Sequence, residues 1–538
     1  MRATTVKTRP SDWARPLLLG LAIAAAVLVA PAVRAAAPGI TGTTFNFDAK
    51  AAYTTQPDGA SIYSWGYGCS AAPSGFAPAG VAGASCPDMQ LPGPTLIVNE
   101  GATITVTLTN NLPAAAGNTS ILFPGFDVTA SGADAVDGLL TKEASNGKSV
   151  TYSFKATSVG THAYFSGTQA DLQVEMGLFG AIIVLPNLSS AVTTACTNTS
   201  NDHARAHDFG TGVELDFRLA PAAYNHSATC YDREYLFQLS EIDPKIHRAA
   251  AEIADCMPAS NGGKSCPTDM RSVITELYHP AYFLVNGRSM PDDMDPNYAS
   301  QYPHQPYNGN PHMHPGEMVL LRVIGQGRWQ HPLHEHGNHV RLLARDGNLL
   351  LAPNTISGEA QARLAGPLLF TTTSTPGQAM DGLFYWTGKG LNWDVFGHGY
   401  ATDTSACIPD ANGYYTSDPT AQNYYEWCAD HKKPLESKPF GNVGSGGPMT
   451  LPDPNIVANG AWYGGSPYLG GEATIRAVGS TPIPPSGTVG NSPTDEAGFA
   501  FMWHSHNERE ITTNNIFPGG MMMMMLVDPR AFLIDEAK

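Results

Sequence analysis

The sequence predicts an all-β protein of two or more domains, and three observations support this fold class. Only 14% of the 538 residues are charged, well below the roughly 25% that is usual in soluble proteins. Glycine and proline are abundant, with 55 and 42 residues, and both mark turns between short elements. Residues 103–109 alternate threonine with apolar side chains, which is the pattern of a strand that buries one face. The chain is long enough for each domain to bury its own core.

The N-terminus has the layout of a secretory signal peptide. Four basic residues precede an apolar run at residues 17–33, and small residues follow at 35–37. We expect residues 1–37 to be removed on export, because the run is short for a retained anchor and no other stretch could span a bilayer. The mature protein is therefore expected in the periplasm, outside the cell or at the cell surface, without a transmembrane segment.

Eight cysteines, an even number in an exported chain, indicate up to four disulfides. The simplest hypothesis joins neighbours in the sequence, although eight cysteines allow many other connectivities. The four pairs are Cys69 with Cys86, Cys196 with Cys230, Cys256 with Cys266, and Cys407 with Cys428.

The first domain is expected at residues 38–190. Residues 149–156 alternate like the strand at 103–109, and residues 176–185 form an apolar run that ends at Pro186, which is typical of a buried strand. Together these strands predict one β-sandwich. Residues 191–231 are polar and lack periodicity, which favours a linker or a long loop.

A second β domain is expected at residues 232–538. Its expected strands include residues 282–287, 317–325 and 499–506, and a short helix is expected around 248–254. From about residue 388 to 496 lies a long insertion rich in glycine, proline, tyrosine and asparagine. Loops of such length are usually functional or form a small subdomain, so two interpretations stay open, a lid over the site and a decorated surface loop.

The charge of the chain excludes one class of partner. The formal net charge is −17, and the clustered lysine and arginine residues that bind phosphate are missing. We therefore expect no nucleic-acid partner.

Four of the seventeen histidines lie within the nine residues HPLHEHGNH at 331–339, and two more follow in WHSH at 503–506. Successive side chains of a strand point to opposite faces, so a His-x-His pair places both imidazoles on one face. Imidazole is a good ligand for copper, zinc, iron and nickel. The two stretches therefore predict a metal site.

These motifs resemble those of the multicopper oxidases, the cupredoxin family that includes laccases and copper-resistance oxidases. LPGPTLIVNEGATITVTLTNNL at 91–112 is similar to the family's opening strand pair, and GTHAYFSG followed by MGLFGAIIV is similar to the end of its first domain. HPLHEHGNH resembles the family's HPxHxHGH motif, and WHSH with PGGM resembles its C-terminal HCH motif. The resemblance covers most of the mature chain, and it implies two cupredoxin-like Greek-key β-sandwich domains with the long insertion in the second.

The resemblance also implies ligand positions. The family normally carries a blue copper, which takes electrons from the substrate, and a three-copper cluster that reduces oxygen to water. By position, His331 corresponds to a blue-copper ligand. The cluster ligands correspond to His334, His336, His504 and His506.

Half of the cluster ligands and most of the blue-copper site are replaced. The first-domain positions of the cluster hold Leu122, Pro124, Phe165 and Gly167. Ser505 takes the place of the blue-copper cysteine, and Glu510 takes the place of the second blue-copper histidine. A blue site depends on a copper–thiolate bond, which a serine hydroxyl cannot supply near neutral pH. Ordinary laccase activity is therefore not expected.

Three interpretations remain for the second domain. The first is a reduced site for one or two copper ions on His334, His336, His504 and His506, serving an atypical copper-dependent oxidoreductase. His331, His339, Glu508 and Glu510 are candidate supplements to this site. Zinc is the alternative metal.

The second interpretation is a copper-binding or carrier protein without turnover. Met521 to Met525 offer thioether sulfur, a ligand that favours Cu(I), although five successive methionines are better explained as a buried strand. The third is a degenerate scaffold with a structural or interaction role. The substrate, whether a small molecule or a metal ion, is not identified by the sequence, and an oligomer is left open.

Overall fold

The computed structural model describes most of the chain beyond the predicted signal peptide. The described residues are 37–78, 81, 83–197, 216–257, 261–262, 264–353, 355, 359–389, 408–417, 425–429, 465–468, 474–475, 489–490, 498–528 and 534. The predicted signal peptide thus lies outside the described residues except for Ala37, as does most of the predicted insertion. Among the described residues no helix is both long and apolar enough to cross a membrane.

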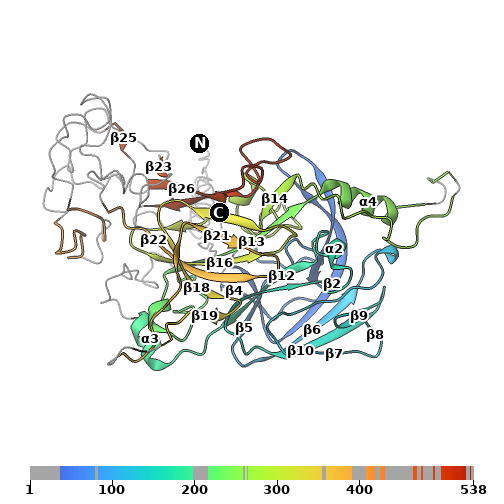
Figure 1. Cartoon of the computed structure of the whole chain (residues 1–538), viewed down its shortest axis with the longest axis horizontal. Coiled ribbons are helices and arrows are strands. Elements are labelled where there is room, and N and C mark those ends of the chain that lie inside the picture. The colour runs from blue at the N-terminus through green and yellow to red at the C-terminus, as the bar shows by residue number, and fades with distance from the viewer. Residues whose placement is uncertain are drawn as a thin grey trace, which may run out of the picture. The chain divides into compact units, whose positions relative to one another are not determined.

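The first β-sandwich consists of two five-stranded sheets. One sheet has the order β3 (Ser61–Cys69), β2 (Thr44–Thr55), β6 (Thr103–Asn110), β10 (Ser149–Lys155) and β7 (Thr129–Ser131). Figure 1 shows β6, β10 and β7 side by side. The other sheet has the order β11 (Gly160–Phe165), β12 (Phe179–Leu185), β5 (Leu96–Asn99), β1 (Gly39–Thr41) and β4 (Gly75–Ala77). The three strands expected from the sequence are β6, β10 and β12.

The pattern of burial explains why these segments form strands. Along β6 the apolar residues Ile104, Val106 and Leu108 are fully buried, whereas the threonines between them are not. The threonines of β6 lie beside polar residues of the neighbouring strand β10, and Thr107 Oγ1 lies 3.1 Å from Thr151 Oγ1. The period of two thus separates a core face from a polar face.

Short elements surround this sandwich. They are the hairpin of β8 (Ala135–Asp137) and β9 (Lys142–Ala144), the helix α2 (Ala170–Gln173) and the 3-10 turn η1 (Ala114–Ala116). The stretch predicted as a linker contains the helix α3 (Ser190–Thr197) and the 3-10 turn η2 (Ser227–Thr229). A disulfide between Cys196 and Cys230 joins these two elements.

Two further disulfides match the predicted pairs, Cys69–Cys86 and Cys256–Cys266. Cys428 is also disulfide-bonded, and its predicted partner Cys407 lies outside the described residues.

The second sandwich packs a seven-stranded sheet on a six-stranded sheet. The first has the order β14 (Tyr282–Val285), β13 (Arg233–Ile242), β16 (Met318–Gly325), β22 (Ala379–Tyr385), β18 (Val340–Arg345) and β19 (Asn348–Leu349), with β20 (Leu368–Leu369) also paired to β18. The second has the order β15 (His312–Met313), β27 (Met522–Val527), β26 (Gly498–Ser505), β17 (His331–Glu335) and β21 (Thr371–Ser374), with β23 (Gly465–Tyr468) paired to β26.

The remaining elements connect or decorate this sandwich. They are the helix α4 (Pro244–Ala254), which covers the predicted helical stretch, the 3-10 turn η3 (Asp292–Met294), and the strand pair of β24 (Thr474–Ile475) and β25 (Val489–Gly490) within the predicted insertion. Asp243 begins α4 by accepting a hydrogen bond from Lys245 N, and Pro244 follows at the first helical position.

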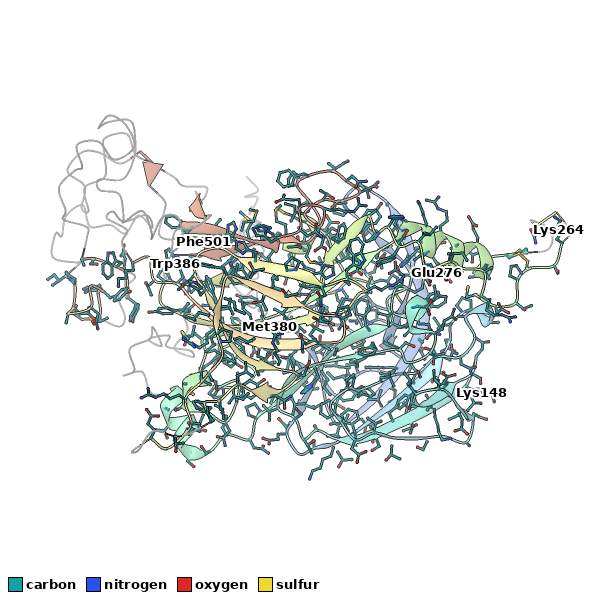
Figure 2. The ribbon with its side chains drawn as sticks, in the orientation of Figure 1. Lys148, Lys264, Glu276, Met380, Trp386 and Phe501 are labelled. Atoms are coloured by element: carbon teal, nitrogen blue, oxygen red, sulfur yellow. A yellow bond between two sulfur atoms is a disulfide. The ribbon has the colours of Figure 1, made fainter. Side chains whose placement is uncertain are left out.

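The core of the second sandwich lies between its two sheets. Trp386, Phe501 and Met380, which are labelled in Figure 2, belong to this core, and the rings of Trp386 and Phe501 lie 5.6 Å apart. Met521, Met523 and Met525 are fully buried in the same core. The methionine run is therefore a core strand, which is the explanation that the sequence favoured. The all-β fold with two β-sandwiches is confirmed.

Candidate metal centre

Two neighbouring strands carry the predicted site. β17 and β26 pair in antiparallel orientation, and His334 lies directly opposite His504. Directly opposite residues in such a pair project from the same face of the sheet. Because side chains alternate along each strand, His336 and His506 project from that face as well. The register thus gathers four imidazoles from segments that are 168 residues apart in sequence.

Three of these imidazoles converge closely enough to bind one ion. Nitrogen atoms of His334, His336 and His504 all lie within 4.8 Å of one another. The Nε2 atoms of His336 and His504 face each other at 3.2 Å. All three side chains are buried. Among the described residues these three, called the histidine trio below, form the one group of this kind.

His506 lies at the solvent side of the trio. It is exposed, and its ring centroid lies 4.7 Å from that of His334. Its backbone N–H donates to Pro332 O at 2.8 Å, so the segment is held against β17. His506 is therefore placed as a fourth imidazole at the mouth of the site.

Hydrogen bonds orient the imidazoles of the trio. His504 Nδ1 donates to Ser505 O at 2.7 Å, which leaves the lone pair of the neutral ring on Nε2, the atom that faces His336. His334 Nδ1 lies 2.6 Å from Thr371 Oγ1 on the adjacent strand β21. Such partners fix the tautomer and the orientation of metal-binding histidines.

Two histidines of the trio, His334 and His504, have lowered pKa values that favour the uncharged ring. Burial, together with the neighbouring imidazoles of His336, His506 and His504, lowers the pKa of His334 to about 4. Burial also lowers the pKa of His504. Metal ions bind the neutral form of imidazole. The donor set of three converging imidazoles therefore fits copper or zinc.

His331 is placed differently from the trio. It is completely buried between two carboxylates, with Nε2 donating to Glu241 at 2.8 Å and Nδ1 donating to Glu510 at 2.9 Å. Burial alone would lower its pKa, but the hydrogen bonds and charges of Glu241 and Glu510 raise it to about 9. The imidazole is thus held as a cation. We call Glu241, His331 and Glu510 the carboxylate bridge.

His331 and Glu510 of the carboxylate bridge, together with Ser505, are the residues whose positions correspond to blue-copper ligands in the motif resemblance. The same Glu510 oxygen that accepts from His331 also accepts a short hydrogen bond from Ser505 Oγ. Asn507 donates to the other oxygen at 2.8 Å. The residues that correspond to three copper ligands therefore bond to one another directly, and the structure does not bring His331 or Glu510 into the trio.

The bridge continues toward the first sandwich. Glu241 accepts from the backbone N–H groups of Arg328 and Trp329 at 2.6 and 2.9 Å, and from Tyr278 Oη at 3.0 Å. Tyr278 also donates to Glu175 at 2.6 Å. Burial raises the pKa of Glu175 to about 8. Sequence reasoning missed Glu241, because it lies on a strand far from either histidine motif.

His339 lies apart from the trio although it belongs to the same motif. Gly337 has φ +100°, and a Cβ there would lie 3.0 Å from the Phe501 ring, so the chain turns sharply after His336. The following strand β18 belongs to the opposite sheet. His339 instead stacks on Phe370 at 3.7 Å between ring centroids. Glu508, the other candidate supplement, is exposed.

Glu335 is a second residue that sequence reasoning missed. It lies between the two histidines of the pair, so it points to the core face of β17 and is completely buried. Within the described residues neither of its carboxyl oxygens has a hydrogen-bond partner. Burial raises its pKa well above the usual value, so the group is a neutral acid. Its polar character within HPLHEHGNH was the available signal.

The fold and the site together define the class of the protein, an all-β protein with two cupredoxin-like sandwiches and, in the second, three histidines close enough together to hold a metal ion. Residues 80–189 match the family model of the multicopper oxidases. The resemblance to the multicopper oxidases inferred from the motifs is therefore confirmed for this part of the chain.

Individual relatives resemble only part of the chain. A multicopper oxidase from Talaromyces pinophilus is 34% identical over 115 residues, which are 21% of this chain and 18% of the relative. A laccase from Aspergillus fumigatus is 37% identical over 98 residues, which are 18% of this chain and 16% of the relative. The chain thus matches less than a fifth of the length of these relatives.

Solved structures match more of the chain at lower identity. The match to the multicopper oxidase mgLAC covers 90% of this chain and 86% of that chain, at 14% identity and a TM-score of 0.43. A blue copper oxidase from Nitrosomonas europaea covers 90% of this chain with 85% of its own length, at 14% identity and a TM-score of 0.42.

Proposed function

We propose that this protein binds copper at the histidine trio and acts as a copper-dependent oxidoreductase that lacks blue copper. The observation that carries the proposal is the convergence of His334, His336 and His504 within 4.8 Å. His506 at the mouth is the fourth ligand candidate. Three imidazoles leave a coordination position open for a substrate or water. Bound there, copper would supply one-electron redox chemistry.

The residues of the chain define the rest of the proposed site. Thr371 and the Ser505 carbonyl orient His334 and His504. The carboxylate bridge holds the segment after His504 through Ser505 and Glu510. Because His331, Ser505 and Glu510 are hydrogen-bonded to one another, they would not bind a blue copper. Electrons would therefore have to enter the proposed site directly from the substrate. Zinc fits the same donor set and is the alternative occupant.

We further propose that the protein works after export. The signal-peptide pattern at residues 1–37 supports export, and so do the three disulfides, because disulfides persist in oxidising compartments.

Metal analysis with turnover measurements tests the proposed function. The purified chain, reconstituted with Cu(II) and desalted, is expected to retain about one copper ion, as a single three-histidine site would. His334→Ala and His504→Ala should each abolish this retention. His339→Ala is the matched control, because it removes a histidine of the same motif outside the trio, and it should retain copper.

Oxygen uptake with phenols, Cu(I), Fe(II) and Mn(II) then separates an enzyme from a carrier. Uptake that disappears in His334→Ala and His504→Ala supports the oxidoreductase. Tight copper binding without uptake for any of these reductants would replace the enzyme with a copper-binding or carrier protein. A chain that retains neither copper nor zinc would rule out both.

A further inference from the structure

A cavity of about 620 Å³ lies beside the histidine motif in the second sandwich. Its floor is built on three adjacent strands, β20, β18 and β22. Arg341 of β18 lies opposite Leu368 of β20 on one side and opposite Leu383 of β22 on the other. His339, just before β18, lines the same cavity as Arg341. A cation and an imidazole therefore share a floor with two leucines.

Two loop segments form the walls. One contains His226 and Ser227, and the other runs from Glu359 to Leu364. His226 Nε2 donates to Ala362 O at 2.7 Å, and Ser227 N donates to Gln361 Oε1 at 3.0 Å. These hydrogen bonds tie the walls to each other. The two wall segments are therefore joined to each other by hydrogen bonds.

The polar groups of the cavity are not all occupied by the protein. Within the described residues, the Arg341 guanidinium makes one hydrogen bond, from Nη1 to Gly366 O at 2.9 Å. The ring nitrogens of His339 make none there, since that residue bonds through its backbone and stacks on Phe370. A second cation, Arg363, is paired with Glu359 at 2.6 Å. Among the described residues, no carboxylate therefore pairs with the positive charge of Arg341 in the cavity.

One aromatic ring separates this cavity from the histidine trio. The Phe370 ring lies 3.7 Å from the ring of His339, which lines the cavity, and 6.4 Å from the ring of His334 in the trio. A molecule in the cavity would therefore lie next to the proposed metal centre.

The geometry points to a binding site for a small carboxylate with an aromatic or apolar body. Arg341 and His339 would hold the carboxylate, because a guanidinium matches the geometry of a carboxylate. Leu368, Leu383 and Leu364 would contact the apolar body. The volume suits a compact ligand, since ligand sites in proteins usually enclose about 300–1,000 Å³. The role of this ligand as a substrate rests on the proposed function, whereas its binding does not.

Benzoate is the probe for the test, and its neutral isostere benzamide is the matched ligand control. Binding is measured by calorimetry and by ligand-observed NMR on the full chain, first without metal. Loss of the charge-assisted contact in Arg341→Gln should weaken benzoate binding about tenfold or more. Benzamide should bind the unaltered chain more weakly than benzoate by a similar factor.

Two variants make the comparison specific. The double variant Glu359→Gln with Arg363→Gln removes both members of the ion pair that lines the cavity. Because it leaves the net charge of the cavity unchanged, it should change benzoate affinity by less than about twofold. Arg341→Lys keeps the charge and should recover part of the affinity, and circular dichroism checks that both Arg341 variants fold. No benzoate binding to the folded chain, or equal binding to Arg341→Gln, would overturn the inference.

The position next to the trio is tested with Cu(II) bound. Copper should speed the relaxation of the ring protons of bound benzoate, and His504→Ala should remove this effect without removing benzoate binding. Unchanged relaxation in a chain shown to hold copper would overturn the substrate role. Failure of the chain to bind copper would overturn the proposed function, while the benzoate affinities would still decide the binding site.

Discussion

The buried cation His331 makes the stability of the fold depend on pH in a defined direction. Its pKa is raised from 6.5 to about 9 by Glu241 and Glu510, which corresponds to about 3 kcal/mol of differential stabilisation. A raised pKa means that the folded state binds the proton more tightly. The contribution is therefore fully present below pH 6.5, and it is lost as the pH rises through 9. His331→Gln removes it at every pH.

Urea unfolding of the metal-free chain between pH 6 and 10 measures this contribution. The difference in unfolding free energy between the unaltered chain and His331→Gln should be largest near pH 6 and should shrink by about 3 kcal/mol by pH 10. His162→Gln is the matched control, because burial lowers the pKa of that histidine, so it should leave the high-pH slope intact. A difference that stays constant from pH 6 to 10 would show that His331 is not a cation held by the two carboxylates.

Three further predictions follow from the site and its surroundings. Glu335→Leu should raise the unfolding free energy by about 1–3 kcal/mol, because it removes a buried acid that has no partner among the described residues, and a loss of stability in thermal melts would contradict this. Bound copper should be retained below pH 6.5, the ordinary pKa of histidine, because burial lowers the pKa values of His334 and His504. An acid titration followed by copper analysis measures this. Release of half of the copper above pH 6.5 would count against neutral ligands. Replacing both Cys69 and Cys86 by alanine should lower the unfolding free energy by about 3 kcal/mol, since the disulfide closes a loop of 17 residues, and an unchanged urea midpoint would show that this disulfide constrains nothing.

The strands of the fold were predictable where the pattern was simple. The alternation around Ile104 to Leu108 and the apolar run before Pro186 became β6 and β12. The pairing of His334 with His504 was predictable in outline, because each His-x-His pair had to lie on a strand. The sequence could not supply the register that places these two residues directly opposite each other, since register depends on the whole sheet.

The surroundings of His331 could not be predicted from the motifs. Its partner Glu241 lies on β13, 90 residues earlier in the chain, and no local pattern links the two. His339 was assigned to the metal site because it belongs to the histidine stretch, but the turn at Gly337 sends it to the opposite sheet, beside the cavity. These differences arise from packing between sheets, which short motifs do not encode.

Pulsed electron paramagnetic resonance of the chain loaded with Cu(II) tests the central claim most directly. The spectra report the imidazole nitrogens bound to copper. The unaltered chain should show coupling of copper to imidazole nitrogens and should lack the intense blue absorption of a thiolate site. The nitrogen coupling should be lost when His334, His336 and His504 are all replaced by alanine. Identical nitrogen coupling in that triple variant would place the copper elsewhere and contradict the account.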